Sequence, residues 1–156
     1  MGLGFDVHPF TDDRRPLVLG GVLLEDERGL AGHSDADVVA HAVADALLGA
    51  AGLGDLGSHF PDTDPAWAGA DSVELLRHVR HLVSEAGWLA VNVDCKVILE
   101  APRLAPHRQA MEERLSAAIA APVTIGAKRA EGLGAIGRGE GIACFAVALV
   151  EPVDDA

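Results

Sequence analysis

Residues 37–51 read Asp-Val-Val-Ala-His-Ala-Val-Ala-Asp-Ala-Leu-Leu-Gly-Ala-Ala, an almost unbroken run of small and apolar side chains. Such a run predicts a helix that is buried on nearly every side. Its polar exceptions, Asp37, His41 and Asp45, are spaced by four residues, so they lie along one face. Buried polar side chains need partners, because leaving them unpaired costs free energy. The face therefore holds either a capping Asp and a hydrogen-bonded core His, or part of a functional site.

The rest of the chain alternates between short strands and amphipathic helices. The cap of the apolar helix is expected at Ser34 or Asp35. Further elements are predicted as strands over residues 3–8, 91–99, 123–127 and 142–150 and a hairpin over 18–24. One more helix is predicted around the amphipathic residues 75–85, and another has Pro106 in its first turn and carries Met111, Leu115 and Ile119. This order predicts an α+β fold, with helices on one face of a mixed four-stranded sheet beside a small hairpin. The length predicts one domain, residues 1–156.

The chain carries 24 acidic and 12 basic residues, a formal net charge of -12. This charge argues against broad binding to nucleic acid or anionic lipid, and no apolar run reaches the roughly 20 residues that a membrane span needs. The N-terminus lacks the basic segment and long apolar core of a signal peptide. Two cysteines are too few for a disulfide scaffold. We therefore expect a cytoplasmic protein with no nucleic-acid or membrane partner.

A second polar pattern lies near the N-terminus, where Asp6, Val7 and His8 follow one another. If this segment is a strand, Asp6 and His8 point to the same face. Together with His41 they would make a three-ligand set for a divalent metal, with the fourth tetrahedral position open for water or substrate. The sequence alone does not show whether the strand and the helix meet.

An acidic loop, residues 54–65, holds Asp55, Asp62 and Asp64 between glycines and prolines. Glycine and proline give such a segment a defined shape rather than a helix or strand. Its carboxylates can accept hydrogen bonds from the hydroxyl groups of a sugar or polyol. An exposed acidic turn accounts for the same composition equally well.

A glycine-rich loop, residues 132–141, surrounds Arg138 with five glycines. Glycines let backbone N–H groups approach a phosphate, and a guanidinium adds a forked cation. The loop adjoins the one basic part of the chain, residues 96–138, which carries seven basic and four acidic side chains. Either chance scatter or a small anionic ligand accounts for this cluster.

Taken together, these motifs resemble the 2-C-methyl-D-erythritol 2,4-cyclodiphosphate synthase family over nearly the whole chain. They stand in the family's order and at matching separations, over residues 4–8, 33–37, 45–50, 54–57, 60–65, 101–103 and 137–143. The resemblance implies a homotrimer of α+β subunits with active sites at the subunit interfaces. It implies a lyase of the non-mevalonate isoprenoid pathway. This lyase closes 4-diphosphocytidyl-2-C-methyl-D-erythritol 2-phosphate into the 2,4-cyclodiphosphate and releases CMP.

The resemblance also implies metal ligands and phosphate contacts. One zinc ion per subunit would be held by Asp6, His8 and His41, and Asp6 and His8 would also contact the substrate. His33 and Ser34 would position the phosphates on the zinc side. A second cation, Mg²⁺ or Mn²⁺, would bridge the diphosphate. By the same resemblance, the Glu131 carboxylate would hold this cation. The Arg138 guanidinium would bind a phosphate near the trimer axis.

Two loops would enclose the organic parts of the substrate by the same resemblance. The methylerythritol would be surrounded by residues of the acidic loop, namely Asp55, Gly57, Phe60, Pro61, Asp62, Thr63 and Asp64, with Asp62 contacting the polyol. The cytidine pocket would be contributed by the neighbouring subunit, from Ala101, Pro102, Arg103, Leu104 and Ala105.

One segment departs from the family pattern. Where the family has a Thr-rich segment before the residue matching Glu131, this chain has Lys128, Arg129 and Ala130. Arg129 stands where the resemblance places an important Thr, and we therefore take it as a candidate catalytic residue. His33, on the phosphate side of the site, is the other candidate. A cation there can replace the hydroxyl at phosphate, crowd the nucleotide, or displace the second metal. The alternatives to the lyase are therefore a metal-binding trimer with weak or no catalysis and a zinc phosphohydrolase.

The expected chemistry agrees with these residues. The 2-phosphate is itself a nucleophile, so no Ser-His-Asp triad is needed, and catalysis reduces to positioning and charge neutralisation. Imidazoles bind zinc in their neutral form. We therefore expect activity to fall below about pH 6.

Overall fold

The structure, a computed structural model, describes residues 1–153. A four-stranded sheet has the order β1-β6-β4-β5, formed by β1 (Gly2–Pro9), β6 (Gly141–Pro152), β4 (Trp88–Ile98) and β5 (Val123–Lys128). β6 runs antiparallel to both β1 and β4, whereas β4 and β5 are parallel. A separate hairpin joins β2 (Leu17–Leu19) to β3 (Val22–Leu24). The mixed sheet and the hairpin predicted from the sequence are confirmed.

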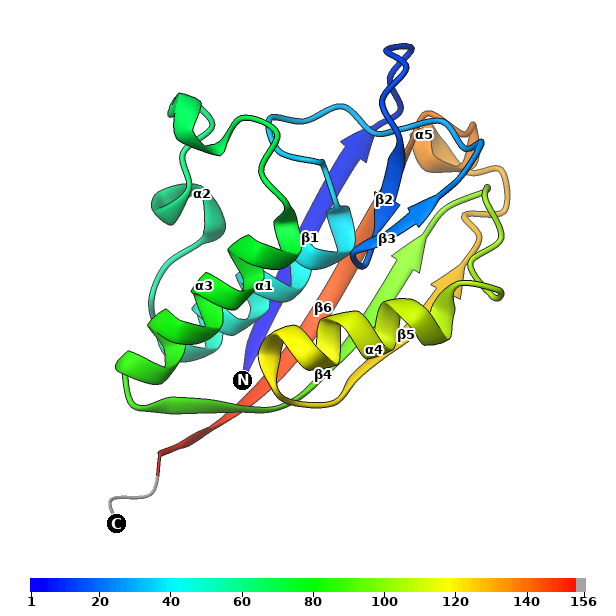
Figure 1. Cartoon of the computed structure of the whole chain (residues 1–156). Helices are drawn as coiled ribbons and strands as arrows, with labels where there is room; N and C mark the ends of the chain where they lie inside the picture. The colour runs from blue at the N-terminus through cyan, green and yellow to red at the C-terminus, as the bar shows by residue number, and fades with distance from the viewer. Residues whose placement is uncertain (154–156) are drawn as a thin grey trace.

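Helices cover one face of this sheet (Figure 1). α1 (Val38–Ala51) lies against β1 and β6, and α3 (Ser72–Glu85) packs beside it. α4 (Arg108–Ile119) connects β4 to the parallel strand β5. The connecting loops contain the short helices α2 (Leu56–His59), η1 (Pro65–Trp67) and α5 (Gly134–Gly137). Because α1 is enclosed between the sheet and α3, its nearly uniform apolar composition is explained.

Two glycines bring α1 and β1 into close contact. A Cβ at Gly2 would lie 2.1 Å from the carbonyl oxygen of Ala46, and a Cβ at Gly4 would lie 1.9 Å from that of Ala42. No side chain fits at either position, so the strand backbone meets the helix directly. Alternation along β1 then places Asp6 on the same face, beneath the first half of α1.

The N-terminus of α1 differs from its prediction. Its cap is Asp37, whose carboxylate accepts hydrogen bonds from first-turn N–H groups, and not Ser34 or Asp35. Between these residues and the helix lies Ala36, whose φ of 58° is left-handed and incompatible with a right-handed helix. The helix therefore begins at Val38, later than the sequence predicts.

Two further details differ from the sequence prediction. Pro106 precedes α4 instead of lying in its first turn, because Leu104 first forms a separate turn, accepting the N–H groups of His107 and Arg108. The short helices α2, η1 and α5 were not predicted, since four residues or fewer carry no helical periodicity.

The second face of the sheet is covered by no element of residues 1–153 (Figure 1). Apolar side chains of β1 and β6 gather there, each between 41% and 67% exposed: Leu3, Phe5, Val7, Phe145, Val147 and Leu149. The rings of Phe5 and Phe145 lie 4.7 Å apart between centroids. We refer to these six residues as the bare apolar face, and exposed patches of this kind mark interaction surfaces. Among the described residues, no helix combines the length and apolarity that crossing a membrane requires.

Candidate active site

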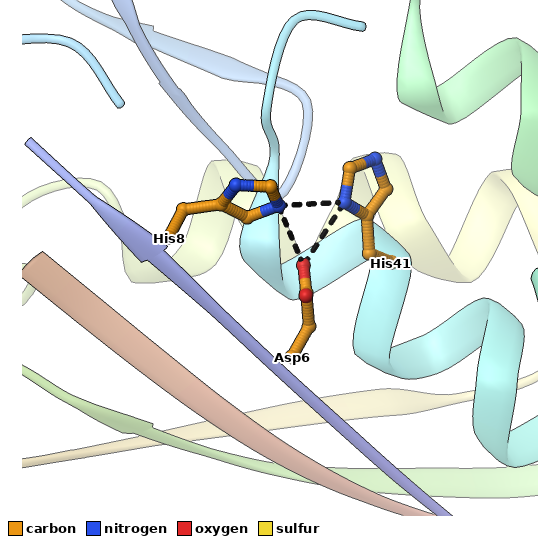
Figure 2. Close-up of side chains that lie close together, drawn as sticks. All are labelled: Asp6, His8 and His41. Atoms are coloured by element: carbon orange, nitrogen blue, oxygen red, sulfur yellow. Dashed lines mark hydrogen bonds and ion pairs between the residues drawn. The ribbon is translucent and has the colours of Figure 1, made fainter. Parts of the chain in front are cut away.

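Three side chains from two elements converge above the sheet (Figure 2). Asp6 and His8 come from β1, and His41 comes from α1. The Asp6 Oδ2 atom lies 3.0 Å from His8 Nε2 and 3.0 Å from His41 Nδ1. The two imidazole nitrogens are 3.3 Å apart. The structure thus brings together the three side chains that the sequence singled out as a possible ligand set, and we call them the triad.

The outward nitrogens of both imidazoles are hydrogen-bonded. His8 Nδ1 donates to the carbonyl oxygen of Ala31 at 2.6 Å, so its Nε2 directs a lone pair into the triad. His41 Nε2 lies 2.8 Å from Ser72 Oγ. The Ser72 hydroxyl donates to Asp35, so it accepts from His41 Nε2–H. Both rings are therefore fixed in the tautomer that a metal ligand needs.

The triad fits a divalent metal ion. In the neutral rings the two inward nitrogens cannot donate to each other, so a cation that both share, either a metal ion or a proton, accounts for their close approach. All three ligand atoms lie within 4.8 Å of one another. Ligands that stand 2.0–2.1 Å from a tetrahedral zinc are about 3.3 Å apart, which the observed separations approach. Two nitrogens and one carboxylate oxygen suit zinc and leave one coordination position open.

The electrostatics of the triad favour an ionised carboxylate. Burial raises the pKa of Asp6, but hydrogen bonds and charge from His41 and His8 outweigh burial and hold that pKa far below its ordinary 3.8. Burial lowers the pKa of His8, but the Asp6 carboxylate outweighs it and raises that pKa above 6.5. A proton therefore competes with a metal ion for His8.

The other members of the polar stripe on α1 have structural partners. Asp37 is fully buried and accepts the N–H groups of Gly20 and Gly21 at 2.8 and 2.6 Å, which joins α1 to the hairpin. Asp45 accepts the N–H of Leu56 at 2.7 Å. Both interpretations of the stripe thus hold in part, since Asp37 is a capping residue and His41 belongs to the triad.

A cavity of about 510 Å³ opens beside the triad. The predicted substrate residues on its wall are His33, Ser34, Gly57, Phe60, Pro61 and Asp62. The Phe60 ring makes edge contacts with Trp67 and His78, at centroid distances of 4.9 and 5.5 Å. These contacts hold the acidic loop against α3, so the cavity has a fixed side wall.

Three predicted residues of the acidic loop do not line this cavity. The Asp55 side chain caps α2 by accepting the N–H of Ser58 at 2.8 Å. Asp64 caps η1, and its carbonyl oxygen accepts from His33 Nε2 at 3.0 Å. Thr63 is exposed. The composition of the loop therefore serves local structure as well as the cavity.

A second pocket, of about 300 Å³, lies where β4 and β5 end. It shares no residue with the cavity beside the triad. Its wall is formed by Leu99, Glu100, Pro102, Arg103, Leu104, Ala105, Ala127, Lys128 and Arg129. Of the residues predicted to hold cytidine, only Ala101 lies off this wall, although its peptide bond to Pro102 is cis and belongs to the same loop.

Two residues predicted to act at the phosphates line neither the cavity beside the triad nor the second pocket. Glu131 is exposed in a left-handed conformation, with a φ of 54°. Arg138 is exposed, and its Nε donates to Glu140 Oε1 at 2.6 Å. Within one chain, the structure therefore leaves both side chains at the surface.

Sequence reasoning missed Arg15. Its guanidinium donates to the carbonyl oxygens of Gly32, at 2.7 Å, and of Ser34. These contacts flank His33 and hold the backbone that carries it to the cavity. An Arg that binds backbone carbonyls follows no residue spacing, so nothing in the sequence marks it.

Similarity to known proteins identifies the fold and the family. A sequence model of the YgbB family matches residues 1–151. The 2-C-methyl-D-erythritol 2,4-cyclodiphosphate synthase of Symbiobacterium thermophilum is 54% identical over 153 residues, which cover 96% of this chain and 97% of that protein. The chain belongs to the YgbB family of 2-C-methyl-D-erythritol 2,4-cyclodiphosphate synthases. A second such synthase, from Rubrobacter xylanophilus, is 56% identical over 97% of this chain and 94% of its own length.

Solved structures of the YgbB family agree with this fold. The bifunctional IspDF from Campylobacter jejuni superposes with a TM-score of 0.93 at 41% identity, over 98% of this chain and 42% of that longer chain. A CDP-bound 2C-methyl-D-erythritol-2,4-cyclodiphosphate synthase gives a TM-score of 0.86 at 38% identity, covering 96% of this chain and 99% of that one. The family resemblance drawn from the motifs is confirmed.

Proposed function

We propose that this YgbB-family chain converts 4-diphosphocytidyl-2-C-methyl-D-erythritol 2-phosphate into 2-C-methyl-D-erythritol 2,4-cyclodiphosphate and CMP. It acts as a lyase of the non-mevalonate isoprenoid pathway. The observation that carries the proposal is the triad on the wall of a cavity that the acidic loop borders. Support comes from relatives of 54% and 56% identity that bear this synthase's name, and from a similar enzyme that binds CDP.

The proposed reaction forms one phosphorus–oxygen bond and breaks another. The 2-phosphate attacks the β-phosphorus, and CMP leaves with the electron pair of the broken bond. Both the attacking and leaving groups are phosphates, so no side chain has to remove a proton from the nucleophile. Held by Asp6, His8 and His41, zinc would supply Lewis-acid polarisation of a phosphate oxygen.

The chain's own residues position the reacting groups. His33 and Ser34 reach the cavity from the segment before α1, where the Ser34 hydroxyl donates to a phosphate oxygen and the His33 ring lies beside the phosphates. Asp62 lies on the opposite loop and accepts hydrogen bonds from the polyol hydroxyls. Holding two reacting phosphates in line is the main requirement of such a transfer.

The nucleotide occupies the second pocket in this proposal. The loop with Ala101 and Arg103 encloses the cytidine, and Arg129 binds phosphate. The Glu131 carboxylate holds Mg²⁺ or Mn²⁺ on the diphosphate, and Arg138 adds a cation for a phosphate near the symmetry axis. Oxygen ligands of this kind suit both of these cations.

A homotrimer would bring the two hollows to one substrate. They share no residue within a chain, which supports a composite site built from two neighbours. The bare apolar face supports the same assembly, because burying it around a three-fold axis removes an exposed apolar patch from water. The two free, buried cysteines, Cys95 and Cys144, fit a cytoplasmic location.

Arg129 favours a second candidate, a metal-binding trimer with weak or no catalysis, because it stands where the family pattern has Thr. One assay separates the candidates: the protein is incubated with zinc, Mg²⁺ and the diphosphocytidyl substrate, and the products are followed by ³¹P NMR. Cyclic diphosphate with equimolar CMP supports the lyase. Inorganic phosphate indicates a phosphohydrolase, and binding without turnover indicates the inactive trimer. Light scattering in the same buffer gives the solution mass and tests the trimer.

A further inference from the structure

The second pocket concentrates positive charge on an acidic protein. Three cationic side chains, Arg103, Lys128 and Arg129, line it together with one acid, Glu100, whereas the whole chain has a net charge of -12. Such a local cluster fits an anionic group such as a nucleotide phosphate. Of these three cations, Arg129 is the one whose head group has hydrogen-bond partners within residues 1–153.

Glu100 holds the guanidinium of Arg129 by two hydrogen bonds. Arg129 Nε and Nη2 donate to Glu100 Oε2 at 2.9 and 2.6 Å. These contacts use two of the five guanidinium N–H groups and leave three, including both on Nη1, for a ligand. Arg129 also lowers the pKa of the Glu100 carboxyl, so that group remains an ionised acceptor.

The second oxygen of Glu100 holds a different segment. Glu100 Oε1 accepts the N–H of Gly132 at 3.2 Å. Glu131 and Gly132 both have left-handed backbones, with φ of 54° and 75°. A non-glycine residue rarely adopts that conformation unless the surrounding structure stabilises it, so the bond from Gly132 helps fix the direction of the Glu131 side chain.

Exposure shows which partner is the fixed one. The Glu100 side chain is 14% exposed, whereas that of Arg129 is 68% exposed. Glu100 directly follows β4, and the neighbouring Leu99 N–H donates to the carbonyl oxygen of Lys128 at 3.0 Å. The carboxylate thus belongs to the sheet edge, and the guanidinium projects from it toward solvent.

We propose that Glu100 is a positioning residue for nucleotide diphosphate binding. One of its oxygens orients Arg129 at the second pocket, and the other holds the turn that carries Glu131. The inference rests on the proposed function for the identity of the nucleotide. It adds that Arg129, which replaces the Thr of the family pattern, can bind phosphate because Glu100 fixes the direction of its guanidinium.

A competing role for Glu100 predicts the opposite result. If the carboxylate competed with phosphate for Arg129, its removal would free the guanidinium and tighten nucleotide binding. If the pair were only a surface contact, its removal would leave binding unchanged. Positioning alone predicts weaker binding when Glu100 is removed while Arg129 remains.

The test measures CDP binding to the full-length protein by calorimetry, with Mn²⁺, for wild type, Glu100→Ala, Arg129→Ala and the double variant. Each single substitution is expected to weaken CDP binding by about tenfold. The double variant is expected to lose less CDP affinity than the sum of the two single losses, because both substitutions remove the shared Glu100–Arg129 contact. Any loss that Glu100→Ala still causes in the Arg129→Ala background reports the contact with Gly132. Glu100→Gln keeps an acceptor for Gly132 but loses the charge, and an intermediate affinity is expected.

A matched control is Glu74→Ala, which removes a similar exposed Arg–Glu contact on α3 and is expected to bind CDP as wild type does. Thermal unfolding and zinc content check that each variant is folded and retains its triad. Unchanged or tighter CDP binding by Glu100→Ala, or fully additive losses, would overturn the inference. So would a wild-type protein that does not bind CDP. A wild type that binds CDP but releases no CMP from the substrate contradicts the proposed function and leaves the positioning result standing.

Discussion

The triad and the second pocket are built in different ways. The triad side chains project from a strand and a helix, and their exposed fractions are only 12–24%. The second pocket depends on loops and strand ends, and its central cation is 68% exposed. Regular elements fix the direction of a side chain through their geometry, whereas loop residues need individual hydrogen bonds. The triad is therefore positioned by regular elements, whereas the second pocket depends on individual contacts such as those of Glu100.

Removal of a triad ligand is the strongest way to test this difference. His41→Ala or Asp6→Ala is expected to abolish zinc binding and lower CMP release by more than about a hundredfold, since even partners of metal ligands account for 10–100-fold. Zinc per chain, by mass spectrometry, and turnover check both effects. His81→Ala, an exposed His on α3, is the control and should keep its zinc. Unchanged metal content in the triad variants would remove the ligand assignment.

The close contact between α1 and β1 predicts a large effect on stability. Gly4→Ala places a methyl group 1.9 Å from a backbone oxygen of α1, so the helix must shift. Overpacking of this kind costs about 1–3 kcal/mol, and the shift would also weaken zinc binding. Gly49→Ala, also in α1 but with open space around its Cβ, should instead stabilise by up to about 1 kcal/mol. Denaturant unfolding compares the two, and equal stability of both variants would contradict the contact.

The second pocket should respond more weakly to substitution than the triad. Arg129→Thr restores the side chain expected in the family but removes the cation that Glu100 holds. We expect kcat/KM for the diphosphocytidyl substrate to fall by about tenfold, with zinc content unchanged. Steady-state kinetics measure the effect. Higher turnover in this variant would show that Arg129 hinders catalysis and would favour the weakly active trimer.

The pKa shifts of the triad predict how its contribution to folding stability depends on pH. The pKa of His8 is raised, so in the metal-free protein its pairing with Asp6 stabilises the fold below about pH 6.5 and is lost as pH rises through the raised value. The pKa of Asp6 is lowered, so its contribution is present above about 3.8 and is lost only in strong acid.

Zinc held by the triad would require the neutral form of His8, so protons would displace the metal as the pH falls below that raised value. Zinc retention during equilibrium dialysis from pH 8 to pH 5 checks this direction. We expect retention and activity to decrease together, starting no lower than about pH 6. Full retention at pH 5 would exclude His8 as a ligand.

The triad could be predicted from the sequence because strands and helices have simple periods. A spacing of two along β1 and a position on an apolar helix were enough to group Asp6, His8 and His41. What the sequence did not reveal is why they meet. Gly2 and Gly4 set the distance between strand and helix, but a glycine in a strand is equally typical of a bulge or a tight bend.

The residues of the second pocket were predicted by resemblance more than by physical pattern. No spacing joins Glu100 to Arg129, because β5 and the chain around it bring together residues that are far apart in the sequence. The same holds for Arg15, which binds backbone carbonyls 17 and 19 residues away. The cap of α1 was misplaced for a related reason, since the left-handed backbone of Ala36 leaves no mark in the sequence.

The separation of the two hollows within one polypeptide has a genetic consequence. If each working centre joins the triad of one copy to the second pocket of another, two differently damaged alleles can complement each other. Consider a cell that expresses one allele defective in His41 and another defective in the second pocket. Some of its mixed oligomers would contain a site that joins an intact triad from one copy to an intact second pocket from the other. Conversely, the product of a single defective allele would inactivate the sites that it shares with wild-type copies.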